Sequence, residues 1–116
     1  MGKFEQSVSP EIRARALRVG DELLFSSSDV LTMIEAASAD GIAVLGVETF
    51  EVRPSGVKPL DYSSYEIPFS GDWTSFVQMN RAEARSFVRS HPLGEEHGYL
   101  LTCASNTEFR DAQKSL

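Results

Sequence analysis

The chain has 116 residues, enough for one domain and too few for two of ordinary size. Its 41% hydrophobic and 24% charged residues are close to globular averages and argue against wholesale disorder. The net charge of −6 argues against nucleic acid or an anionic membrane surface as the main partner and leaves a basic protein open. No apolar run approaches the roughly 20 residues that span a bilayer, and the start lacks the apolar core of a signal peptide, so we expect a cytoplasmic protein.

Two helices are predicted in the first third of the chain. Ser9-Pro10-Glu11 offers an N-cap, a proline at the first helical position and an acid in the first turn, and the apolar spacing that follows continues until Gly20. The apolar run 21–25 fits no single type of element. The second helix begins after the capping serines 26–28 and ends at Asp40-Gly41. Its apolar residues, at spacings i, i+3, i+4 and i+7, are Val30, Met33, Ile34 and Ala37.

Two extended segments joined by a turn come next. Residues 42–53 are rich in β-branched and aromatic side chains and predict a long strand. Gly46 and Glu48 interrupt its apolar alternation, so either a bulge at Gly46 shifts the alternation or Glu48 points into a polar pocket. Pro54-Ser55-Gly56 predicts a turn, and residues 57–69 return as a second strand whose two prolines place it at a sheet edge.

The third predicted helix has the strongest amphipathic pattern in the chain. It begins after Asp72, which is placed to cap it, and ends at about Ser90. Asn80 lies on its apolar face and is interpreted as a buried amide with satisfied hydrogen bonds. Tyr99–Ala104 is the last strand, and residues 106–116 form a polar tail that fits either a frayed end or a short helix. The remaining residues of the apolar face are Trp73, Phe76, Val77, Ala84, Phe87 and Val88.

This order of elements predicts an α+β fold in one domain spanning residues 1–116. We expect an antiparallel or mixed β-sheet packed against about three helices. The segments 1–8 and 106–116 are the candidates for flexible ends.

The residue types needed for catalysis or metal binding are sparse. Cys103 is the only cysteine, and with His91 and His97 as the only histidines a structural zinc site is implausible. Cys103 also sits in an apolar strand, where an inert thiol is the usual outcome. The chain carries no nucleophile-elbow, phosphate-loop or zinc-protease motif. We therefore expect no enzymatic activity, no metal and no cofactor.

The charge is concentrated in the middle of the chain. Residues 19–80 hold ten acidic and two basic residues, a net of −8, which suits either ordinary solubility or the docking of a basic partner. The predicted turn at residues 54–56 brings acids and tyrosines from its two sides together, a mixture typical of binding surfaces. The candidate contact residues are Glu48, Glu51, Asp61, Tyr62, Tyr65 and Glu66.

Three arginines recur every four residues in the third helix, at Arg81, Arg85 and Arg89. They lie along one helix face, where like charges repel mildly. We interpret them as a solvated face bridged to carboxylates elsewhere in the fold.

Several short stretches resemble one family in order and spacing. They are the hexapeptide 19–24, the run Ser28–Leu31, the glycine-ended helix and strand 41–50, and the pattern from Trp73 to Phe87, together with Pro59 and Tyr65. Over about residues 19–104 the chain resembles the immunity protein 40 family of bacterial proteins that guard against polymorphic toxins. The resemblance implies a small protein that binds a cognate toxin domain stoichiometrically and occludes it. Many such toxins are basic nucleases, against which an acidic surface would speed association.

Two other classes stay open. A small-molecule binding or enzymatic domain would have a well-formed pocket near Glu48 and Cys103, lined by aromatic residues. A self-associating structural domain would have a large apolar patch. A broad acidic surface without such a pocket would favour the immunity protein.

Overall fold

The computed structural model describes residues 9–64, 71–90 and 97–114, and gives the backbone alone for 61–64, 97 and 112–114. Helices and strands alternate along these residues in the pattern expected of an α+β domain, which confirms the predicted fold class. The elements are α2 (Pro10–Arg15), β1 (Leu17–Val19), β2 (Glu22–Leu24), α3 (Ser27–Ala39), β3 (Ala43–Arg53), β4 (Gly56–Ser64), α4 (Trp73–Ser90), β5 (His97–Ala104) and α5 (Asn106–Lys114).

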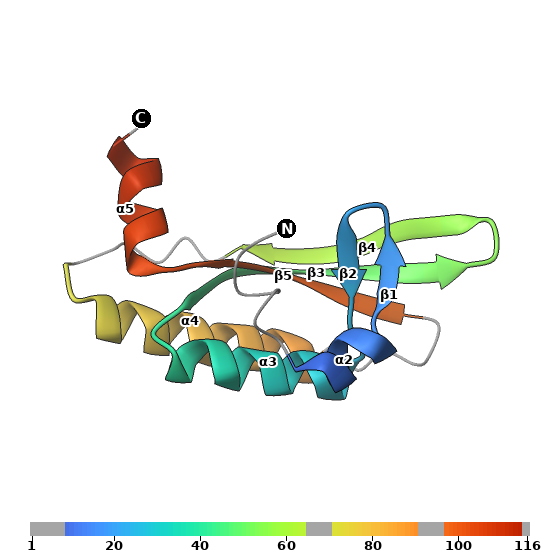
Figure 1. The fold of residues 1–116 in the computed structure, drawn as a ribbon, viewed down its shortest axis with the longest axis horizontal. Coiled ribbons are helices and arrows are strands. Elements are labelled where there is room, and N and C mark those ends of the chain that lie inside the picture. Colours follow the sequence, from blue (N-terminus) through green and yellow to red (C-terminus); the bar gives the residue numbers. More distant parts are fainter. Residues whose placement is uncertain (1–8, 65–70, 91–96, 115–116) are drawn as a thin grey trace.

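The main sheet has three antiparallel strands in the order β4-β3-β5. The helices α3 and α4 run side by side along one face of this sheet (Figure 1). Strands β1 and β2 form a separate hairpin that is joined to β5 by one bridge between Phe25 and Tyr99. The hairpin and α5 rise toward the other face from opposite ends of the sheet (Figure 1). That second face is therefore left between two projecting elements.

Local sequence signals explain where the long helices begin and end. Ser26 caps α3 by accepting a hydrogen bond from the backbone N–H of Asp29 at 3.2 Å. Gly41, with a φ of +73°, ends α3 in a Schellman motif, in which the Ile42 N–H donates to the Ala37 carbonyl at 2.8 Å. Asp72 caps α4 as predicted, and hydrogen bonds from Ser75 lower the pKa of its carboxyl.

The core lies between the sheet and the two long helices. Its main cluster joins the apolar stripe of α3 and the C-terminal half of α4 to the helix-facing side of β3 and β5. A smaller cluster of Ala43, Phe76 and Val77 lies near the start of α4, where Trp73 and Phe109 pack against it. The fully buried residues of the two clusters include Val30, Met33, Ile34, Val44, Val47, Ala84, Val88 and Tyr99.

A bulge in β3 settles the question raised by its irregular alternation. Between the pairs Val44–Cys103 and Gly46–Thr102, Leu45 is an extra residue without a partner in β5. The bulge shifts the alternation by one residue, so Val44 and Val47 are both buried against the helices. Glu48 accordingly belongs to the opposite face of the sheet. The first of the two predicted explanations is confirmed, with the bulge centred one residue earlier.

The first helix is shorter than predicted. It ends at Arg15, and residues 17–24 form the β1–β2 hairpin instead of continuing the helix to Gly20. Gly20, with a φ of +61°, is the first residue of a two-residue turn, where a glycine fits the geometry that strand twist requires. The Gly-Asp pair between apolar residues was the hairpin signal, and it competed with a weak helical spacing.

A paired carboxylate fastens α2 to α3. Arg15 donates hydrogen bonds to both carboxylate oxygens of Asp29, at 2.8 and 3.1 Å. These hydrogen bonds hold the pKa of Asp29 below its ordinary value, against the opposing effect of burial. The ion pair thus holds the end of α2, from which the chain continues into β1, against α3.

Asn80 is fully buried between α4 and the sheet, as predicted, but its hydrogen bonds are only half satisfied. Its Nδ2 donates to the Phe76 carbonyl at 2.9 Å, while none of the described residues donates a hydrogen bond to its Oδ1. The interpretation of a fully satisfied amide is therefore wrong for the oxygen, because only the donor reaches a carbonyl one helical turn earlier.

Candidate protein-binding site

The predicted acidic surface is built on the β3–β4 hairpin. The turn at Pro54-Ser55 is present, and the strands pair so that Glu48 lies opposite Tyr62 and Thr49 opposite Asp61. Leu60 is an extra residue in β4 between the pairs Thr49–Asp61 and Phe50–Pro59. β4 is an edge strand, as its prolines predicted. The backbone therefore brings three of the candidate positions, 48, 61 and 62, next to one another. Tyr65 and Glu66 lie outside the described residues.

Glu51 differs from Glu48 in both charge environment and direction. Its carboxylate forms an ion pair with Arg53 at 2.8 Å, and Lys58 is its partner in β4. It lies three positions further along the strand than Glu48, an odd number, so the two side chains stand on opposite faces of the sheet. The charge of Glu51 is thus largely neutralised. Its side chain is on the helix side of β3, next along the strand after that of the buried Thr49.

Glu48 stands on the face of the sheet that α3 and α4 leave uncovered. We call this surface the open face. Glu48 is half-buried as a residue, and no described residue donates a hydrogen bond to its carboxylate or forms an ion pair with it. The neighbouring side chains are mostly apolar and themselves half-buried. The described residues of the open face include Gly46, Glu48, Phe50 and Val52 of β3, Val57 and Pro59 of β4, and Gly98, Leu100 and Thr102 of β5.

The β1–β2 hairpin adjoins the open face, and sequence reasoning gave it no functional role. Leu24 lies over Gly98: a Cβ added at Gly98 would come within 2.8 Å of the Cβ of Leu24. Leu17 pairs with Leu24 and so shares its side of the hairpin, as does Val19 by alternation. Leu17 is 42% exposed and Val19 is 36% exposed. The hairpin therefore adds an apolar surface beside the sheet.

The arginine row of α4 lies on the other side of the molecule. Arg81 and Arg85 both bond to Glu35 of α3, at 2.7 and 3.0 Å, which confirms the predicted bridging for two of the three. Arg89 is exposed near the C-terminal end of α4, where a cation complements the helix dipole. A shallow groove of about 410 Å³ runs beside Arg85 and Arg89.

The geometry offers no support for chemistry shared by Glu48 and Cys103. Cys103 pairs with Val44 and packs against the core on the helix side, whereas Glu48 belongs to the open face. A pocket lined by both would have to pass through the sheet. Within the described part of the chain, no group of three or more His, Cys, Asp or Glu residues is placed to hold a metal ion. None of the described helices is both long enough and apolar enough to cross a membrane.

Fold and site together define an α+β domain with a three-stranded sheet open on one face. Comparisons with family models, curated proteins and solved structures find no match to this chain.

Proposed function

We propose that this protein is a cytoplasmic immunity protein that binds a cognate bacterial toxin domain and neutralises it by occlusion, without catalysis or a cofactor. The observation that carries the proposal is the open face, where the carboxylate of Glu48, with no ion-pair partner among the described residues, lies among half-buried apolar side chains. The resemblance of residues 19–104 to the immunity protein 40 family supports the same function.

Glu48 and its apolar neighbours together favour a partner that carries both a cation and apolar side chains. A carboxylate among apolar neighbours attracts a cation from another molecule more strongly than a fully solvated one does. The surrounding apolar area would be removed from water in the same step. A basic protein surface with exposed apolar side chains supplies both, and the net charge of −6 would steer it toward the site.

The inhibition that follows is stoichiometric. One molecule covers the active site or substrate groove of one toxin, so protection depends on the amount of complex. A basic nuclease is the toxin class that suits an acidic inhibitor best, because its substrate groove is already cationic. The predicted contact residues are Glu48, Glu51, Asp61, Tyr62, Tyr65 and Glu66. Glu48 is the member on the open face that carries the proposal, and Glu51 is the least favoured, because it stands on the helix side and Arg53 already neutralises it.

The test is a protection experiment in bacterial cells. The C-terminal domain of the secreted protein expected upstream of this gene is expressed from an inducible promoter, with or without the chain. We expect growth to be restored by the intact chain and not by a frame-shifted control. Loss of growth regardless of the chain, with both proteins present on an immunoblot, would contradict the proposal.

A further inference from the structure

We propose that the β1–β2 hairpin forms the apolar half of the toxin-binding surface. The partner is inferred to be a basic, amphipathic segment of the toxin, whose apolar side chains cover Leu17 and Val19 while a cation pairs with Glu48. This inference rests on the proposed function. It adds the β1–β2 hairpin to the contact residues that were predicted on β3 and β4.

The exposure of the hairpin is the first observation. All three residues of β1 are exposed, although two of them, Leu17 and Val19, are branched apolar residues. An isolated two-stranded hairpin is only marginally stable in water, and this one is anchored chiefly through β2, whose Leu23 and Leu24 are buried. The fold thus buries Leu23 and Leu24 almost completely, whereas Leu17 and Val19 keep 42% and 36% of their surface exposed. Contact with a binding partner would explain why apolar side chains are exposed at these two positions.

The position of the hairpin is the second observation. Leu24 lies over Gly98, and Gly98 pairs with Phe50 across the open face. The next pair along the same face, two residues further on, is Leu100 with Glu48. Successive residues on one strand face are separated by about 7 Å, so a single helix or strand can touch the hairpin and Glu48 together.

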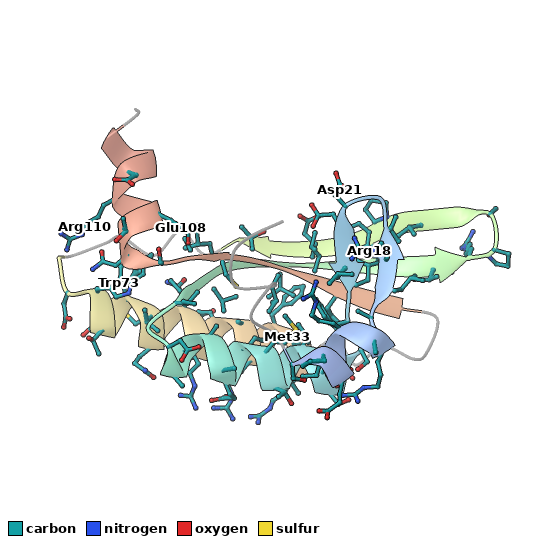
Figure 2. The ribbon with its side chains drawn as sticks, viewed as in Figure 1. Arg18, Asp21, Met33, Trp73, Glu108 and Arg110 are labelled. Atoms are coloured by element: carbon teal, nitrogen blue, oxygen red, sulfur yellow. The ribbon has the colours of Figure 1, made fainter. Side chains whose placement is uncertain are left out.

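Charge determines which partner fits. Asp21 stands at the tip of the hairpin (Figure 2). Glu22 pairs with Val19 and so lies on the same side of the hairpin as Leu24. Like Glu48, neither forms an ion pair with any described residue, whereas Arg18 falls on the opposite side of the hairpin by alternation. The surface is therefore apolar with acids at its centre and rim. A second copy of this acidic chain would bring like charges together, and a basic partner would not.

The probe is the purified C-terminal domain of the upstream secreted protein, inactivated in its active site. Its affinity is measured by titration calorimetry for the intact chain, for the double variant Leu17→Thr/Val19→Thr, and for Glu48→Lys. Threonine has the β-branched shape that strands favour, so the hairpin is preserved. The matched controls on α4 are Met79→Gln, which replaces a 52% exposed methionine, and Glu83→Lys, which reverses an exposed acid.

We expect the double variant and Glu48→Lys each to weaken binding at least tenfold, while both controls stay within about twofold of the intact chain. Circular dichroism melts must show that every variant is folded. Only the Glu48→Lys loss should shrink as salt is raised, because that contact is electrostatic.

Two results would overturn this inference and leave the immunity function intact. One is full affinity of the double variant. The other is a dimer of the isolated chain, seen by sedimentation, that the double variant dissociates. Failure of the intact chain to bind the probe would instead overturn the proposed function and this inference together.

Discussion

Phe76 offers the most direct test of how α4 is attached to the sheet. Its side chain is 3% exposed and lies with Ala43 and Val77 in the smaller core cluster. The ring contacts those of Trp73 and Phe109, with centroids 5.3 and 5.1 Å apart. Phe76→Ala would therefore remove a nearly fully buried ring and two aromatic contacts.

Substitution of a buried phenylalanine by alanine usually costs about 3–5 kcal/mol. Trp73 and Phe109 are only partly buried and can move into the space, so the lower part of that range, about 3–4 kcal/mol, is expected for Phe76→Ala. A domain of 116 residues has a total stability of about 6–17 kcal/mol. The substitution should then lower the melting temperature by about 12–16 °C.

Urea unfolding followed by circular dichroism measures the loss directly. Met79→Ala is the control on the same helix: its side chain is 52% exposed, and the change should stay within about 0.5 kcal/mol. A loss below about 1 kcal/mol for Phe76→Ala would refute the packing of α4 on β3 described above.

The remaining predictions concern the ion pair and two glycines. Because Arg15 lowers the pKa of Asp29, the stability that this pair provides is complete above the ordinary value of 3.8 and is lost as the pH falls through the lower folded pKa. Asp29→Asn should therefore lower the urea midpoint more at pH 6 than at pH 2, and an equal loss at both would contradict the assignment. Gly98→Ala should displace the hairpin, because its Cβ would meet that of Leu24 at 2.8 Å, and proteolysis within residues 17–24 should quicken; an unchanged cleavage rate would be inconsistent with this contact. Gly41→Ala should cost about 1–2 kcal/mol because of the φ of +73°, measured by thermal melts, and no loss would argue against the Schellman motif.

Strong periodic signals in the sequence predicted most of the fold. The apolar stripes of α3 and α4 and the capping residues Ser26 and Asp72 lead to the correct helices, because burial and hydrogen-bond satisfaction act there in the same direction. The hairpin at residues 17–24 was missed because the apolar spacing of the first helix continues to Val19. Tertiary contacts of Leu23 and Leu24 outweigh that weak spacing.

The candidate site was predictable only in part. A turn signal at residues 54–56 suffices to pair β3 with β4 and to bring Glu48 near Tyr62. The odd spacing of Glu48 and Glu51 puts them on opposite faces, but which of the two reaches the open face depends on the bulge at Leu45, and a sequence gives the bulge without its position. The exposure of Leu17 and Val19 is a consequence of the hairpin. It could not be predicted from a sequence in which the hairpin itself was missed.

The central claim is stoichiometric neutralisation of a toxin, and one titration tests it most directly. The active toxin domain is held at a concentration well above its dissociation constant for this chain, and its enzymatic activity is followed as the chain is added. The account predicts a linear fall that ends at one molecule of chain per toxin, with the inhibition relieved by Glu48→Lys. Full toxin activity in a large molar excess of the folded chain would contradict it.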